Sequence, residues 1–144
     1  MNFIQKDIIV DKTVVAKVFK YTSQKFKGIK FFTSSDLNFQ VGLMVHSKNH
    51  IIKPHFHINR KKIIKQMSEL LIIFSGTLKV YFYNKKKIKY KTVILNNKDM
   101  ILLISGGHGF KVLKKIEMLE IKQGPFVGEK DKIRLEKLWI NLYL

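Results

Sequence analysis

The sequence predicts an all-β protein whose strands close into a double-sheet jelly-roll barrel, followed by a short C-terminal helix or tail. Short segments rich in β-branched and aromatic residues recur at even spacing, and polar turns separate them. Hydrophobic residues make up 46% of the 144 residues, which is enough to bury a core. Evenly spaced short strands favour an all-β sandwich or barrel over alternating strands and helices.

Strands are predicted throughout the first part of the chain. Thr13 to Tyr21 and Gly28 to Thr33 are rich in β-branched and aromatic residues, and a polar stretch ends the second of them. In Phe39 to His46 the apolar residues fall on alternate positions, which is typical of a half-buried strand. Ile51 to Ile58 is predicted as the next strand, and it carries two histidines.

The second part of the chain is predicted to consist of hairpins. Ser75-Gly76 and Lys114-Lys115 are typical of hairpin tips, and polar turns are expected at 84–87 and 96–99. The strands between these turns are Glu69 to Phe74, Thr77 to Tyr83, Ile88 to Leu95, Met100 to Ile104, His108 to Leu113 and Ile116 to Lys122. Residues 132–144 are predicted to form the short helix or tail.

Four polar residues suggest a metal site. His55 and His57 are two positions apart, so in the predicted strand both imidazoles point to the same face. Imidazole nitrogen is the commonest protein ligand for Zn, Fe, Ni, Cu and Mn. Glu69 opens the next apolar segment, and His108 follows two glycines that permit a tight reversal. A carboxylate and a third imidazole would complete a site for one ion.

The order of these residues resembles the motifs of the cupin superfamily. His55-x-His57, Glu69 and Gly76 follow the order of the first motif, and the second ends at His108. The resemblance covers 42–123. It implies a single cupin domain over 1–144, with N-terminal strands in 1–38, the barrel at about 39–123 and an extension in 124–144. It also implies one divalent transition metal ion (Zn, Fe, Ni, Mn or Cu) held by His55, His57, Glu69 and His108.

The sequence departs from the cupin pattern at several positions. Eleven residues separate His57 from Glu69, where the family has three or four, and Gln66 is an alternative to Glu69 as a ligand. In the second motif, Lys98 replaces a glycine and Ile104 replaces a proline.

The formal net charge of +18 comes almost entirely from lysine, since Arg60 and Arg134 are the only arginines. A solvated lysine-rich surface, attraction of an anionic ligand and nucleic acid binding are the three explanations. Nucleic-acid-binding proteins favour arginine for bidentate contacts, so we expect no nucleic acid partner.

Composition also indicates the compartment. The chain has no cysteine, which excludes disulfides, thiolate ligands and a cysteine nucleophile. No apolar run reaches the length of a membrane span, and Asp7 and Asp11 interrupt the region where a signal peptide is apolar. We expect a cytoplasmic protein with no membrane partner.

Two classes of function stay open, because a fold does not define a reaction. The first is a metal-dependent cupin enzyme of the dioxygenase or isomerase type that acts on an anionic or sugar-like small molecule. The second is a barrel that binds a small molecule, such as a sugar, without turnover. A metal-free sugar-nucleotide isomerase or epimerase, with His55 or His57 as general base, is a further option.

A pocket and a homodimer are also predicted. The loop Asn59 to Ser68 is expected at the mouth of a small-molecule pocket, where its positive charge would attract an anion. Its basic residues are Arg60, Lys61, Lys62 and Lys65. The N-terminal strand and the apolar tail Leu138 to Leu144 lie outside the matched barrel, and we expect them to pack on a second copy.

Four further aromatic side chains have ordinary structural explanations beside functional ones. His46 and His50 are expected at the surface or at a strand edge, with a replacement metal ligand as the alternative. Tyr81 and Tyr83 are expected to pack in the sheet, with a substrate contact as the alternative.

Overall fold

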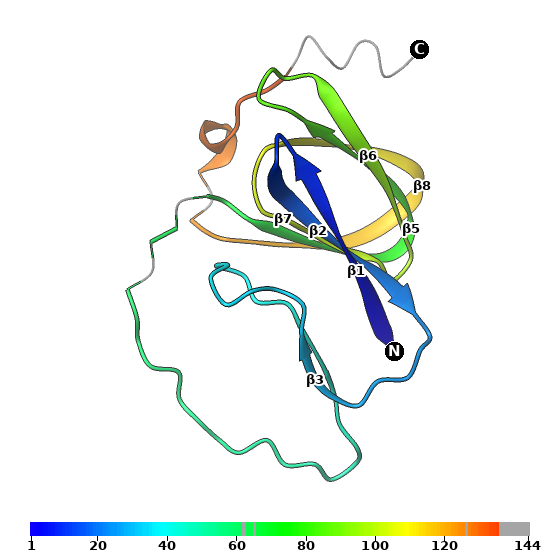
Figure 1. Cartoon of the computed structure of the whole chain (residues 1–144), viewed down its shortest axis with the longest axis vertical. Helices are drawn as coiled ribbons and strands as arrows, with labels where there is room; N and C mark the ends of the chain where they lie inside the picture. The colour runs from blue at the N-terminus through cyan, green and yellow to red at the C-terminus, as the bar shows by residue number, and fades with distance from the viewer. Residues whose placement is uncertain (62, 65, 126, 136–144) are drawn as a thin grey trace.

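The computed structural model describes residues 1–61, 63–64, 66–125 and 127–135 (Figure 1). Over these residues the protein is all-β apart from one short 3-10 helix, and no helix there is long and apolar enough to cross a membrane. The elements are β1 (Asn2–Val10), β2 (Thr13–Thr22), β3 (Gly28–Phe31), β4 (Gly42–Val45), β5 (Glu69–Tyr83), β6 (Lys89–Asn96), β7 (Met100–Leu103), β8 (Gly107–Lys122) and η1 (Gly128–Asp131).

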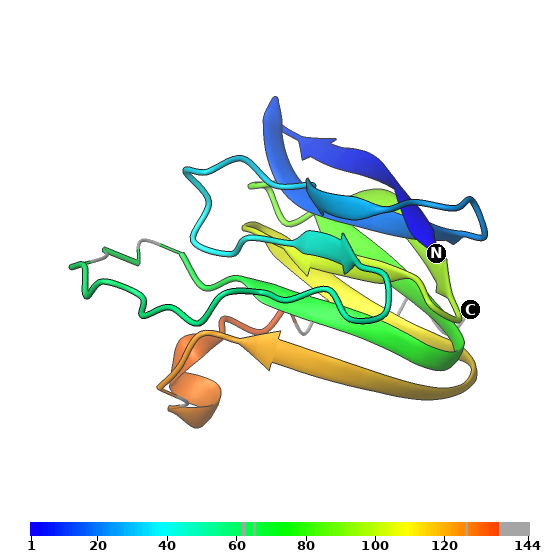
Figure 2. The same cartoon turned by 90° about the horizontal axis from the view of Figure 1, so that it is seen from below.

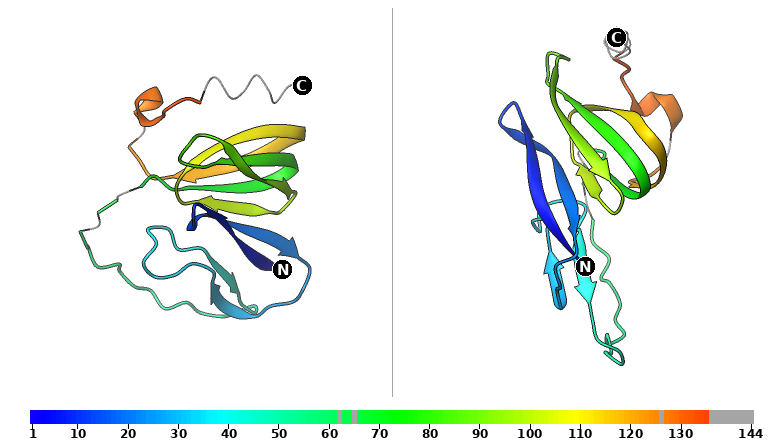
Figure 3. Two further views of the ribbon diagram at one scale, coloured as in Figure 1. Left: turned by 45° about the horizontal axis from the view of Figure 1, so that its top comes forward. Right: turned by 90° about the vertical axis from the view of Figure 1, so that its right-hand side faces the viewer.

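A strongly curled antiparallel sheet forms the body of the protein. Its strands run in the order β1-β2-β7-β5-β6, and β8 also pairs with β5. Strands β6 and β7 follow one edge of β5 in turn, while β8 follows the other edge along its whole length. Figures 1 and 3 show the result as a half-barrel. The two-stranded sheet β3–β4 lies beside it.

Two apolar clusters use opposite faces of β2 and β7. The first includes Val18 of β2 and Ile101 of β7 and fills the inside of the curl. The second includes Phe19 of β2, Leu102 of β7 and Leu43 of β4, and it joins the half-barrel to the β3–β4 sheet. Adjacent residues of a strand point to opposite faces, so the apolar side chains of β2 and β7 supply both clusters.

A buried carboxylate connects β2 to the turn between β6 and β7. Asp99 is 4% exposed, and its Oδ1 accepts a hydrogen bond from the Tyr21 amide at 3.0 Å. Its Oδ2 accepts hydrogen bonds from the Asn96 amide at 2.8 Å and from Lys20 Nζ at 2.6 Å. Three donors compensate the buried charge, so this contact fixes the position of β7 against β2.

Both predicted hairpin tips, at Ser75-Gly76 and at Lys114-Lys115, are wrong. The chain does not reverse at either position and continues as single strands of 15 and 16 residues. The pairing of β5 with β8 shifts register around Gly76, whose φ is +89°. A Cβ at Gly76 would collide with the carbonyl oxygen of Lys115. The glycine therefore bends a paired strand, where a turn was expected to reverse the chain.

The predicted strand Ile51 to Ile58 is also wrong. The described part of 46–68 contains no strand, and the side chains of 51–58 are exposed, Phe56 completely. Two of its apolar residues, Ile51 and Ile52, are adjacent, and Pro54 has no N–H donor. The segment therefore lacks the alternation and the donors that a half-buried strand needs.

The other predicted strands agree with β2, β3, β4, β6 and β7 to within a few residues. The sequence pattern does not delimit β1, because Gln5, Lys6 and Asp7 interrupt its apolar residues. Of the predicted C-terminal helix or tail, 132–135 are not helical. Residues 136–144, including the apolar segment expected to contact a second copy, lie outside the described residues.

Candidate functional site

The curl of β5 brings its two ends close together. Glu69 at the first end pairs with Leu103 of β7, and Tyr83 at the other end pairs with Gly107 of β8. Four chain steps join Leu103 to Gly107 and span at most about 15 Å. With about 5 Å for each cross-strand pair, the ends of β5 lie within about 25 Å of each other. A straight strand of the same length would span roughly 46 Å, so β5 must turn back on itself.

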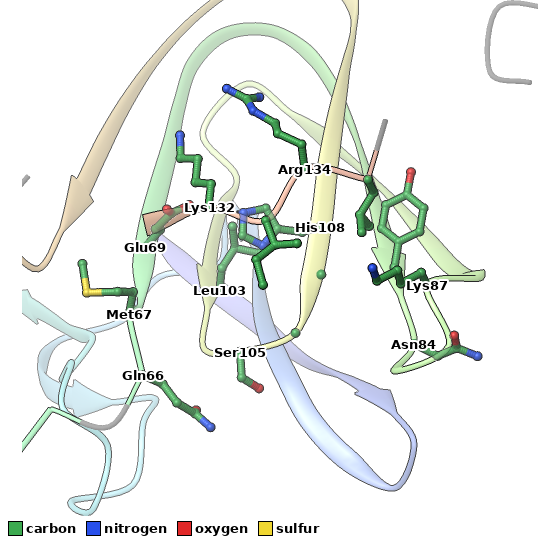
Figure 4. Close-up of a pocket in the computed structure, with 15 residues that line it drawn as sticks. Gln66, Met67, Glu69, Asn84, Lys87, Leu103, Ser105, His108, Lys132 and Arg134 are labelled. Carbon is green, nitrogen blue, oxygen red and sulfur yellow. Dashed lines mark ion pairs between the residues drawn. The ribbon is translucent and has the colours of Figure 1, made fainter. Parts of the chain in front are cut away.

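A carboxylate–imidazole pair forms inside this curl. His108 Nε2 lies 3.3 Å from Glu69 Oε2, and the side chains are 27% and 19% exposed (Figure 4). Glu69 is the first residue of β5, whereas His108 pairs with Phe82 near the far end of that strand. The structure thus brings together two of the four predicted site residues, from opposite ends of one bent strand.

Glu69 is held in its charged form. The hydrogen bond from His108 is the main cause that keeps the pKa of Glu69 below its ordinary range, and partial burial works against it. A positive charge on His108, when that imidazole takes up a proton, and the charges of Lys122 and Lys132 lower the pKa of Glu69 further. A carboxylate that stays ionised orients the imidazole and fixes which nitrogen carries the proton.

The pair lines a cavity of about 670 Å³, a size typical of small-molecule sites. Its walls come from the start of β5, the turn after β5, the β7–β8 turn and the segment after η1 (Figure 4). Lys87, Lys132 and Arg134 line it, and Glu69 is the one carboxylate among its described lining residues. The other charged side chains among the described lining residues are cations, which favours an anionic ligand.

The hydroxyl of Tyr83 is buried in the wall of the cavity. Tyr83 is 4% exposed, and its oxygen has no hydrogen-bond partner among the described residues. Burial raises the pKa of Tyr83, and neighbouring Tyr81 raises it further, so the phenol keeps its proton. A buried hydroxyl without a partner is unfavourable, and an oxygen atom of a ligand would satisfy it.

The β7–β8 turn holds His108 in place. The Ile104 amide donates a 2.8 Å hydrogen bond to the carbonyl of Val15, which anchors the turn on β2. A Cβ at Gly107 would lie 3.2 Å from the Cβ of Tyr83, so glycine allows β8 to start close against the end of β5. His108 follows directly and is therefore positioned by backbone contacts on both sides.

His55 and His57 lie on the exposed segment that precedes β5, which runs outside the sheet in Figures 1 and 2. Their rings are 5.1 Å apart, and His55 Nδ1 lies 2.9 Å from the carbonyl of Lys53. Over the part of the chain that the structure describes, no three His, Cys, Asp or Glu side chains are grouped to hold a metal ion. Glu69 and His108 fit a metal site as two donors, and the four-ligand site stays a prediction.

Other residues singled out in the sequence occupy varied places. His46 and His50 stack at 4.0 Å, and Nε2 of His46 is buried without a partner among the described residues. Gln66, the alternative to Glu69, lines the cavity, so the end of the predicted basic loop reaches it. Lys62 and Lys65 of that loop lie outside the described residues.

Sequence patterns missed the cations of the cavity. Lys87 belongs to a polar turn, and Lys132 and Arg134 follow the last strand, so each looks like an ordinary solvated residue. No local signal marks them as site residues. The curl of β5 brings their segments to one cavity, and that curl is a tertiary feature.

Searches for a matching protein family, for a similar curated protein and for a similar solved structure found no match. The half-barrel is compatible with a β-barrel fold. The resemblance to cupins therefore rests on the motif residues themselves.

Proposed function

We propose that the cavity binds an anionic small molecule and that Glu69 and His108 act on it as an acid–base pair. One observation supports this proposal: a carboxylate–imidazole pair lines a cavity whose other charged residues are cations. A histidine oriented by a carboxylate is a common general base. The reaction class that suits this arrangement is proton abstraction and return on one ligand, as in an isomerase.

The proton transfer follows from the hydrogen bond. With Nε2–H of His108 donating to Glu69, the neutral imidazole keeps a lone pair on Nδ1. Nδ1 takes a proton from an acidic C–H or O–H group of the ligand, and Glu69 stabilises the imidazolium that forms. The same nitrogen then returns the proton to the ligand, so no oxidant or second substrate is required.

The remaining polar groups bind and orient the ligand. Lys132, Arg134 and Lys87 supply positive charge for a carboxylate or phosphate group. The Tyr83 hydroxyl, which is buried behind the cavity surface, donates a hydrogen bond to a ligand oxygen near the other end of β5 when the wall shifts to uncover it. A ligand held at both places would lie across the acid–base pair.

A binding screen with matched variants tests this proposal. Sugar phosphates and small carboxylic acids are compared with neutral analogues by thermal shift and calorimetry at low salt. We expect anions to bind and Lys132→Ala to weaken their binding about tenfold, while Lys6→Ala, at an exposed position of β1 that does not line the cavity, leaves affinity unchanged. Equal binding of neutral analogues would contradict the proposal.

Chemistry is tested separately from binding. For any anion that binds, exchange of its hydrogens with deuterated solvent is followed by NMR. We expect His108→Ala to abolish exchange and Glu69→Gln to slow it at least tenfold, because the base loses its orienting carboxylate. Binding without exchange would leave the alternative of a barrel that binds a small molecule without turnover.

We propose a metal-binding cupin jelly roll as the second candidate, because the pair at the cavity consists of two of the four motif residues. In this candidate Glu69 and His108 are two ligands, and His55 and His57 complete the site when their segment closes over the cavity. A divalent ion would act there as a Lewis acid or redox centre. Elemental analysis of protein purified without a His tag tests it. Absence of metal, with no thermal shift on addition of Zn, Mn, Ni or Fe, would reject it.

A further inference from the structure

Strand β8 has an open edge. Among the described residues it pairs with β5 alone, and Figure 2 shows it as the outermost strand on its side of the sheet. Its middle part exposes large apolar side chains, including Leu113 at 46% and Leu119 at 44%. A long open edge with exposed apolar residues is a template for pairing with another strand.

The edge formed by β1 is less suited to pairing. Its central residues Gln5, Lys6 and Asp7 are polar, and Asp7 is already bound by Lys17 at 2.9 Å. Both edge strands have register shifts, one in β1 between Ile8 and Ile9 and three in β8 where it pairs with 73–78, so the two edges differ in their exposed side chains and not in their regularity. Of these two edges, β8 is therefore the one that invites a partner.

We propose that β8 pairs antiparallel with β8 of a second copy, about a two-fold axis at Ile116, so that one sheet continues through a homodimer. This proposal does not depend on the function of the cavity. A two-fold axis perpendicular to a sheet keeps each side chain on its own face. Directly opposite residues of an antiparallel pair point to the same face, whereas neighbouring residues of one strand point to opposite faces. An axis between two residues would place residues of different faces opposite each other, so the axis must pass through a residue position.

Charge selects the axis position. With the axis at Ile116, Lys115 lies opposite the partner's Glu117, and Leu113 lies opposite the partner's Leu119. An axis at Lys115 or at Glu117 would place that residue opposite its own copy, and like charges directly opposite are destabilising. An axis at Ile116 therefore forms one pair of opposite charges and one apolar pair on each side of the axis, and two of each kind in the dimer.

The absence of cysteine makes the register directly testable. Single variants Leu113→Cys and Leu119→Cys are prepared and oxidised, alone and as a mixture. Opposite residues of antiparallel strands have Cα atoms about 4.5 to 5.5 Å apart, which suits a disulfide, whereas each position lies roughly 20 Å from its own copy. We expect rapid cross-linking only in the mixture. Equal cross-linking in all three samples, or in none, would overturn the proposal.

A charge exchange provides the second test. Light scattering should give twice the monomer mass of 17.0 kDa for the native chain. Lys115→Glu should raise the dimer dissociation constant about tenfold, because it creates two like-charge pairs. The double variant Lys115→Glu, Glu117→Lys restores opposite charges and should recover dimerisation. It also loses the 3.3 Å hydrogen bond from Ser75 to Glu117, so recovery would come from the interface.

Two outcomes of these experiments contradict the β8 dimer. A 17.0 kDa particle at about 100 μM would show that the open edge stays solvated. A dimer that persists unchanged in Lys115→Glu would show that another element, such as the C-terminal tail, holds the copies together.

Discussion

The Glu69–His108 pair and the His55–His57 pair show two ways in which this chain presents polar side chains. Glu69 and His108 stand on paired strands, and the bend of β5 brings them to 3.3 Å. His55 and His57 stand on an exposed segment without strand pairing. Strand pairing holds Glu69 and His108 in place before a ligand binds. Fixing His55 and His57 in one geometry would cost conformational entropy, because no strand pairing holds their segment. Backbone pairing, more than spacing in the sequence, determines which residues are preorganised.

Breaking the bend of β5 should have the largest effect. Gly76→Ala places a Cβ against the Lys115 carbonyl at a φ that L-residues avoid. We expect a loss of about 3 kcal/mol or more in the free energy of unfolding, from backbone strain and overpacking together. Urea denaturation followed by circular dichroism measures it.

Gly28→Ala is the matched control for the bend. Gly28 also has a positive φ, of +103°, but a Cβ there would meet nothing within 4 Å. Only the backbone strain applies, and we expect a loss of about 1 kcal/mol. Equal losses for the two variants would mean that close contact with β8 does not define the bend.

Removing the buried hydroxyl of Tyr83 tests whether this group contributes to ligand binding or to the stability of the free protein. Tyr83→Phe deletes an oxygen that has no partner among the described residues, so the free protein should be unchanged or up to about 1 kcal/mol more stable. Affinity for a bound anion should fall about tenfold, since the ligand loses one hydrogen bond. A destabilised free protein would show that the hydroxyl has a structural partner.

The pH dependence of stability should reveal the Glu69–His108 contact, with a smaller effect. The folded-state pKa of Glu69 is lowered, so its contribution is present above the ordinary pKa of a glutamate and is lost as the pH falls through the lowered value. We expect the free energy of unfolding of the native protein to exceed that of Glu69→Gln by about 0.5 to 1 kcal/mol near pH 6, and the difference to vanish once the pH has fallen through the lowered pKa of Glu69. The control His55→Ala, His57→Ala should change stability by less than about 0.5 kcal/mol.

The all-β class was predictable because most strands alternate and are bounded by polar turns, whereas closure into a jelly roll stays a prediction. The two errors in β5 and β8 have one cause. Gly76 and the Lys114-Lys115 pair look like hairpin tips locally, and only the pairing of the two strands shows that they bend instead. Ile51 to Ile58 contains apolar residues typical of a strand, but no strand pairs with it in the described part of the chain.

The candidate site was predictable in part. Glu69 and His108 could be singled out because their residue types and order follow a known motif. Tyr83 and Lys132 could not, since their roles depend on how far β5 curls and on where the chain runs after η1. Turn residues can be recognised locally in a sequence. The curvature of a long strand is the sum of small contributions from many residues, and a single sequence does not show it.

The bend of β5 places His108 against Glu69, and a measured pKa of Glu69 reports on this contact without intermediate steps. Carbon-13 NMR of the side-chain carboxyl groups follows this titration in the native chain, in His108→Ala and in His55→Ala, His57→Ala. We predict a pKa of Glu69 below its ordinary range in the native chain, a rise in His108→Ala and no change in the double variant. A pKa of Glu69 that is the same in His108→Ala as in the native chain, or that changes in the His55→Ala, His57→Ala variant, would show that His108 is not the partner of Glu69.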